Sequence, residues 1–127
     1  MTREQRDSFI RLVAELDPVQ FRHGDCIGAD SDAHDIITRY GNDTYIIIHP
    51  PKNERYRAFK DGNIILEAKR YLERNKDIVD LSDVLVSCPK TAENKMSGGT
   101  GFTIRYALSH ACPVIIILPD GTLERYD

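Results

Sequence analysis

A glycine-rich segment, Ser97-Gly98-Gly99-Thr100-Gly101, is the part of the sequence best suited to hold a phosphate. It lies between an apolar run typical of a strand and an apolar pattern typical of a helix. Glycines let the backbone approach a ligand closely, and the first amides of a helix donate hydrogen bonds to anions. The hydroxyls of Ser97, Thr100 and Thr103 can add donors. We therefore predict a phosphate site, with a plain flexible connection as the alternative; the segment matches neither a Walker A loop nor GxGxxG.

Polar residues also gather between His23 and Asp30, at the end of another predicted strand. Asp25 lies where a carboxylate can accept two ribose hydroxyls. Asp30 comes near the start of the next predicted helix, where capping that helix and binding a ligand are equally good interpretations. His34 shares a helix face with Asp30, and a packed core histidine is its favoured interpretation. The other candidate ligand contacts in this cluster are His23, Gly24, Cys26, Gly28 and Ala29.

Two more segments add candidates. His49 and Pro50 end a run of β-branched residues, at the expected edge of a sheet. Arg74 and Arg105 lie close in sequence to the other loops, where either guanidinium can clamp a phosphate through two hydrogen bonds. Because isolated arginines on helices are more often solvated, only their neighbourhood favours a role in binding.

The cysteines indicate neither a disulfide framework nor a zinc site. Cys26, Cys88 and Cys112 are odd in number and widely spaced, without the paired spacing of zinc ligands. A metal held by cysteine, histidine and aspartate side chains at the strand ends is the less favoured reading, as is a nucleophilic Cys26, since a lone thiol in a loop is usually inert. We predict no metal and no cofactor.

Hydrophobic periodicity predicts the elements that position these residues. Helices are predicted over residues 2–16, with Thr2 as N-cap, 29–40 and 101–111, with shorter helical segments over 64–72 and 71–81. Strands are predicted over residues 19–23, 44–49, 84–88 and 113–119, followed by a short edge strand through Leu123, and residues 52–63 are predicted to form a loop. This alternation predicts an α/β, Rossmann-like fold of three layers, with a mainly parallel sheet covered by helices on both faces. In such sheets ligands bind at the carboxyl ends of the strands.

Length and composition limit the possible classes. A chain of 127 residues, 41% of them hydrophobic, suits one domain over residues 1–127. The apolar run Val114–Leu118 is far shorter than the ~20 residues that a membrane-spanning helix needs. The charged N-terminal segment has no apolar stretch typical of a secretory signal, so we expect a cytoplasmic protein. A net charge of −3 disfavours binding to duplex DNA through a broadly basic surface.

Taken together, the motifs resemble the SLOG superfamily, which includes the DprA/Smf DNA-processing proteins, the LOG phosphoribohydrolases and many small uncharacterised proteins of phages and bacteria. The resemblance rests on HGDCxGAD at 23–30 with His34, HPP at 49–51, Arg74-Asn75 with Ile78-Val79 and Ser82-Asp83, and SGGTGxTIRYA at 97–107. It covers residues 2–121. It implies a Rossmann-like domain that binds nucleotides or nucleotide-derived sugars over the glycine-rich segment, and it adds Asn75 to the candidate site.

The sequence departs from this superfamily in two respects. LOG enzymes carry PGGxGTxxE, and the same spacing from Gly98 places Phe102 at the threonine and Arg105 at the catalytic glutamate. The resemblance therefore leaves enzymatic activity uncertain. Related domains also begin with a central strand before their first helix, and that strand is missing here. Because unpaired strand edges are costly, three arrangements are open: the remaining strands close together in a changed order, a second chain pairs there, or the natural chain starts upstream of Met1. We favour the first two and expect a homo-oligomer.

Three functions remain in competition. The leading hypothesis is a binding domain that recognises a nucleotide or an ADP-ribose-like metabolite, acting as a sensor or a sequestering module. The first alternative is hydrolysis of a nucleotide N-glycosidic bond, with Asp25 or Asp30 as the catalytic carboxylate. The second is a DprA-like binder of single-stranded nucleic acid, which the net charge and the absence of tryptophan disfavour.

Overall fold

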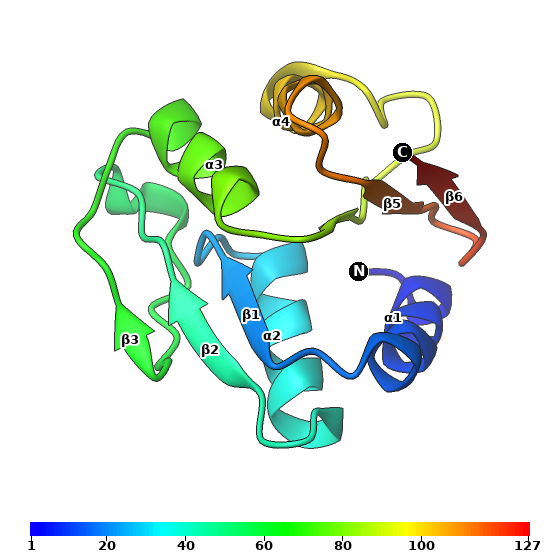
Figure 1. Ribbon diagram of the computed structural model, residues 1–127, viewed down its shortest axis with the longest axis horizontal. Helices are drawn as coiled ribbons and strands as arrows, with labels where there is room; N and C mark the ends of the chain where they lie inside the picture. The colour runs from blue at the N-terminus through cyan, green and yellow to red at the C-terminus, as the bar shows by residue number, and fades with distance from the viewer.

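The computed structural model describes residues 1–127 and has a mixed α/β fold (Figure 1). The chain forms, in order, α1 (Arg3–Leu16), β1 (Gln20–His23), α2 (Ala29–Tyr40), β2 (Tyr45–Ile48), a 3-10 turn η1 (Glu54–Tyr56), β3 (Ile64–Ile65), α3 (Tyr71–Asp80), β4 (Leu85–Ser87), α4 (Gly98–Ser109), β5 (Val114–Ile117) and β6 (Leu123–Tyr126). The predicted alternation of strands and helices is confirmed. None of the helices is both long enough and apolar enough to cross a membrane.

The strands form two small sheets instead of one. In the first, β1, β2 and β3 are all parallel, with Phe21 opposite Ile46 and Ile47 opposite Ile64. In the second, β4 and β5 are parallel and β6 runs antiparallel to β5. β1 and β4 each pair on one side only, so the prediction that the strands close together in a changed order is wrong for this chain. No hydrogen-bonded ladder joins the two sheets.

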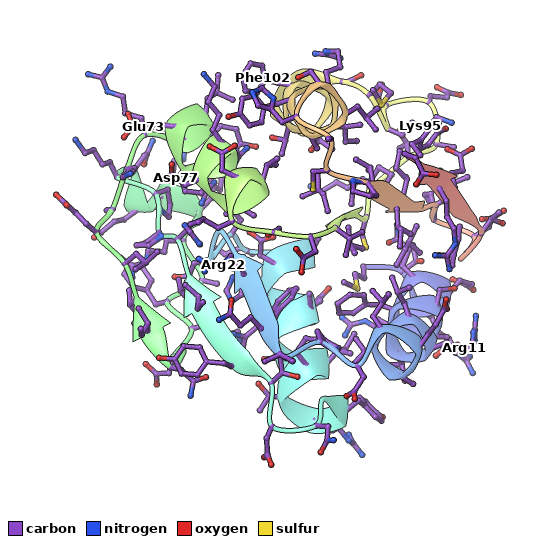
Figure 2. The ribbon with its side chains drawn as sticks, viewed as in Figure 1. Arg11, Arg22, Glu73, Asp77, Lys95 and Phe102 are labelled. Carbon is purple, nitrogen blue, oxygen red and sulfur yellow. The ribbon has the colours of Figure 1, made fainter.

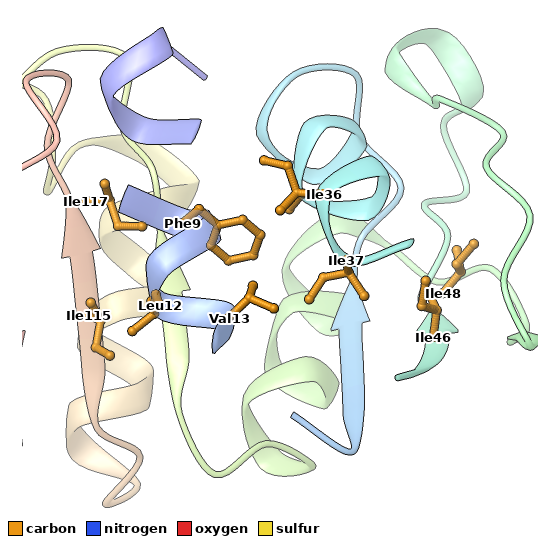
Figure 3. Packing of buried hydrophobic residues seen from close by; sticks show 10 residues of the cluster. Phe9, Leu12, Val13, Ile36, Ile37, Ile46, Ile48, Ile115 and Ile117 are labelled. Carbon is orange, nitrogen blue, oxygen red and sulfur yellow. The ribbon is translucent and has the colours of Figure 1, made fainter. Parts of the chain in front are cut away.

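A shared hydrophobic core nevertheless holds the sheets together (Figure 3). One cluster combines residues of α1, α2, β2 and β5. Its buried members are Phe9, Leu12, Val13, Ala33, Ile36, Ile37, Ile46, Ile48, Ile115 and Ile117. A second cluster packs α3 and α4 against Val114 and Ile116 of β5. Since side chains alternate along a strand, helices cover β5 on both faces.

The first helix is fixed at the carboxyl ends of β4 and β5. Thr2 forms the predicted N-cap, because its hydroxyl accepts a hydrogen bond from the Gln5 amide while the Gln5 side chain accepts one from the Thr2 amide. The buried Gln5 amide group also donates to the carbonyls of Pro89 and Ile117, at 2.8 and 2.9 Å. The start of α1 is therefore tied to the ends of both strands.

Two predicted elements differ from the structure. Ile64 and Ile65 do not begin a helix; they form β3 beside Ile47 and Ile48, in keeping with the preference of β-branched residues for strands. The helix predicted to begin at residue 101 begins at Gly98. The glycine-rich segment is consequently the first turn of α4 and not a loop that precedes it.

Candidate functional site

The first turn of α4 offers uncapped backbone amides. The Gly101 amide donates to Ser97 O at 3.0 Å, whereas the amides of Gly98, Gly99 and Thr100 have no protein acceptor, and the Ser97 side chain does not cap the helix. Gly98 has a φ of +59°, which favours glycine. Gly101 is required for another reason, because a Cβ there would overlap the Met96 carbonyl. This helix start can therefore donate to an anion.

Arg74 of α3 ties together the carboxyl ends of β1 and β2. It is only 2% exposed, and its guanidinium donates to the carbonyl of Gly24 and to that of His49, the latter at 3.2 Å. A Cβ at Gly24 would collide with this guanidinium, so the close approach requires glycine. A second Arg74 nitrogen lies 3.6 Å from Cys26 Sγ. Arg74 forms no ion pair with any carboxylate.

Tyr71 connects Arg74 to the start of α4. The Arg74 guanidinium lies 5.0 Å from the centre of the Tyr71 ring, and the same ring packs against Gly99, where a Cβ would collide with it. Asn75 adds a second link, because its side chain donates to the Thr103 hydroxyl at 2.9 Å, and Thr103 donates to Gly99 O at 2.8 Å. These contacts link α3 directly to the start of α4.

Asp25 is fully engaged within the protein. It is 0% exposed, one carboxylate oxygen accepts from Arg57 Nε at 2.9 Å, and the other accepts from the Lys60 amide at 3.0 Å. Its backbone has a φ of +58°. These contacts pin the β1–α2 loop to the segment after η1, and they leave neither oxygen of Asp25 for a ribose.

Asp30 keeps one oxygen free. Its Oδ2 accepts from the amides of Gly24 and Cys26, both at 3.1 Å, while its Oδ1 has no protein donor. The N-cap of α2 is Gly28, so Asp30 organises the preceding loop instead of capping its own helix. Asp30 and Arg74 both bind the Gly24 backbone, Asp30 at the amide and Arg74 at the carbonyl.

His23 and His34 form a buried pair. His23 Nε2 lies 3.0 Å from His34 Nδ1, and His23 Nδ1 accepts from the Asp25 amide at 2.9 Å. Burial lowers the pKa of both rings, so both are neutral at pH 7. The interpretation of His34 as a packed core histidine agrees with this environment. His23 holds the loop after β1 through its hydrogen bond with the Asp25 amide.

The remaining predicted residues lie around this site. His49 and Pro50 are buried at the end of β2, Gly28 and Ala29 begin α2, and Arg105 is exposed and donates to Met96 O at 3.2 Å. Burial raises the pKa of the Cys26 thiol, which disfavours the thiolate that a nucleophile needs. The structure contains no cluster of three or more histidine, cysteine, aspartate or glutamate side chains suited to a metal ion.

Comparison with family models, with curated proteins and with solved structures finds no match to this chain. The site therefore has to be argued from its own geometry. Sequence reasoning missed Tyr71 and Arg57. It also missed Arg22 of β1, whose guanidinium contacts the His49 ring. Tyr71 precedes Arg74 by three residues on one helix and so shares its face, a spacing that could have identified it. Arg57 lies far from Asp25 in sequence, and no local pattern links the two.

Proposed function

We propose that the protein binds a nucleotide or a nucleotide-derived sugar, with its phosphate on the first turn of α4 and its ribose beside Asp30. The observation that carries this proposal is the packing of the Tyr71 ring between the Arg74 guanidinium and Gly99. This ring places the loop after β1 and the start of α4 on one surface. A ligand that joins an anionic group to a hydroxyl-bearing sugar fits a surface with unpaired amides at one end and a free carboxylate oxygen at the other.

The proposal extends to the architecture. We propose that the two sheets are the halves of one Rossmann-like layer, in the order β3-β2-β1 and β4-β5-β6. This is supported by the cluster that α1 and α2 form with both sheets, and by the packing of α3 and α4 on the opposite face of β5. In such a layer, ligands bind where the strand order reverses, which here lies between β1 and β4. Membership of the SLOG superfamily belongs to the same proposal.

Binding is favoured over hydrolysis of a glycosidic bond. Asp25, the first candidate for a catalytic carboxylate, has both oxygens engaged by Arg57 and Lys60. The helix position that matches the glutamate of LOG enzymes carries Arg105, an exposed cation. The site therefore supports a role as a sensor or a sequestering module.

The experiment is a thermal-shift and calorimetric comparison of ADP-ribose, AMP and ribose 5-phosphate, run with the wild type and with Gly99→Val. Valine at this position displaces Tyr71 and covers the neighbouring amides, so we expect about tenfold or greater loss of affinity while the domain stays folded. Ser109→Val, at the exposed end of the same helix, is the matched control. Unchanged binding by Gly99→Val would place the phosphate elsewhere, and release of free base by the wild type would favour the hydrolase.

A further inference from the structure

A cavity of about 350 Å³ lies beneath α3, beside the carboxyl ends of β2 and β3. Arg74 and Asp77 of α3 line it together with Leu81, the residue that follows the helix, and their spacing puts all three on one side. His49 and Lys69 line it from the chain that follows the strands. A volume of this size is within the range of small-molecule sites.

The lining of this cavity carries two cations, Lys69 and Arg74, and two carboxylates, Glu67 and Asp77, but only one ion pair forms among them. Lys69 and Asp77 form an ion pair at 2.6 Å and neutralise each other, and Glu67 is an exposed carboxylate of the lining. Two guanidinium groups, those of Arg74 and Arg22, form no ion pair, and the Nε of each is buried without a hydrogen-bond partner. Arg22 lies outside the lining, so an anion placed here is stabilised by the desolvated guanidinium of Arg74, since burying a charge without a partner is costly.

His49 connects the two arginines. Arg22 Nη1 lies 3.1 Å from His49 Nε2, and Arg74 donates to the His49 carbonyl (Figure 2 labels Arg22 on β1 and Asp77 on α3). A guanidinium can only donate, so His49 Nε2 is the acceptor and the ring proton must sit on Nδ1. This Nδ1–H has no protein acceptor. Arg22 therefore fixes the tautomer of a residue that lines the cavity and leaves its Nδ1–H as a free donor.

Burial, followed by Arg22, lowers the pKa of His49 to about 4, with Arg74 and His23 acting in the same direction and Asp77 against it. The ring is thus a neutral donor at pH 7 and leaves the positive charge of the site to the arginines. We propose that this cavity is a second anion-binding site, which takes an oxyanion such as a phosphate group or a carboxylate on Arg74 and the Nδ1–H of His49. Arg22 is a positioning residue that acts through His49. The inference goes beyond the nucleotide site on α4 and does not rest on it.

The test uses inorganic pyrophosphate and succinate as separate probes, so that the phosphate and carboxylate forms of the ligand are distinguished. NMR of the histidine rings is recorded as a function of pH with and without each probe. A bound anion favours the imidazolium, so the pKa of His49 should rise from about 4 when a probe binds. No shift of His49 with either probe at millimolar concentration would overturn the proposal.

Arg22→Gln separates a positioning role from a structural one. We expect the nitrogen shifts of His49 to show a mixture of tautomers and the affinity for the probe to fall about tenfold or more, with circular dichroism unchanged. Arg39→Gln, an exposed arginine of α2, is the control, and Arg22→Lys replaces the variant if glutamine prevents folding. Unaltered binding and an unaltered tautomer in a folded Arg22 variant would overturn the assignment. Gly99→Val, which changes the nucleotide site, should still bind pyrophosphate at this cavity. The proposal for the cavity and the proposal for the nucleotide site can therefore fail separately.

Discussion

At the scale of single residues, Asp25 shows how a candidate for chemistry can prove to be a structural support. Its carboxylate joins Arg57 and the Lys60 backbone with no exposure to solvent. The motif around it suggested a ribose contact, because an aspartate at the end of a strand is placed for one. The local sequence pattern did not reveal the partner of Asp25, because this partner lies more than thirty positions later in the chain. Asp30, for which capping and ligand binding were equally good interpretations, does not cap its helix and keeps one oxygen free.

Replacing Asp25 with asparagine tests this support. Asp25→Asn keeps the acceptor for the Lys60 amide but removes the buried charge that pairs with Arg57, and we expect a loss of about 1–3 kcal/mol in the free energy of unfolding. Urea denaturation measures it. Asp43→Asn is the matched control, since Asp43 also has a positive φ, of 55°, but is exposed. Nucleotide binding by the folded Asp25→Asn protein should be unchanged; loss of binding without loss of stability would return Asp25 to the ligand site.

The buried histidines predict how stability depends on pH. The folded pKa of His49 is about 4, below its ordinary value of 6.5, so the unfolded chain takes up a proton first as the pH falls. Its contribution is complete above pH 6.5 and is lost between pH 6.5 and about 4, amounting to about 3 kcal/mol. His23 and His34 act in the same direction. Urea denaturation at a series of pH values gives the free energy of unfolding as a function of pH. This free energy should fall less steeply with falling pH for His49→Gln than for the wild type, and an equal pH dependence of the two proteins would contradict this environment.

At the scale of elements, the first turn of α4 carries the strongest local constraint. Tyr71 packs where a Gly99 side chain would lie, so a small substitution should act on the contact between α3 and α4. Gly99→Ala is expected to swing the half-exposed Tyr71 ring away from Arg74, with a modest effect on stability and about tenfold weaker nucleotide binding. Tyr71→Leu should give the same loss without altering the helix. Normal binding by Tyr71→Leu would show that the ring does not contribute to the site.

Several elements followed directly from local patterns. The apolar spacing and capping residues of α1 and α2 predicted both helices closely, and the continuous isoleucine runs predicted β2 and β5. Ile64 and Ile65 were assigned to a helix because a short apolar run has no clear period, and only their pairing with β2 makes them a strand. The start of α4 was placed late because glycines weaken a helix signal, although here they occupy its first turn.

The candidate site was predictable in its parts but not in its connections. The predicted residues Gly24, Asp30, Arg74 and Gly99 are linked by contacts, since Asp30 and Arg74 both bind the Gly24 backbone and Tyr71 lies between Arg74 and Gly99. Tyr71, which joins them, sits on the first turn of a helix whose start was left uncertain. The unpaired guanidinium of Arg22 depends on the tertiary neighbourhood of β1, which no spacing along the chain describes.

At the scale of the whole molecule, the separation of the two sheets is the main departure from expectation. The backbone carbonyls of Val19 and His23 accept hydrogen bonds from the chain of β2, so the amides of the alternate residues Gln20 and Arg22 face away from β2. Likewise, the Leu85 amide donates a hydrogen bond toward β5, so the Val86 amide faces away from β5. We expect the amides of Gln20, Arg22 and Val86 to exchange with solvent much faster than those of β2 and β5. Hydrogen exchange followed by NMR measures this.

Sedimentation at micromolar concentration supplies the companion measurement. Fast exchange at both free edges in a monomer is the expected result for the chain as described. Protection of these amides in a dimer would show that a second chain pairs there, in line with the homo-oligomer that the sequence suggested. Protection in a monomer would contradict the two-sheet arrangement.

The two sheets pack against each other through side chains, without hydrogen bonds between their strands. A ligand that reaches from Gly24 to Gly99 would therefore add a direct link between the two sheets. Without it, the half built on β1–β3 and the half built on β4–β6 can open against each other by repacking a core, with no backbone ladder to break. With it, the halves should melt together. Calorimetry is therefore expected to show a broad transition for the free protein and a sharper one, at higher temperature, for the nucleotide complex. Occupancy of the proposed site would then raise the cooperativity of unfolding.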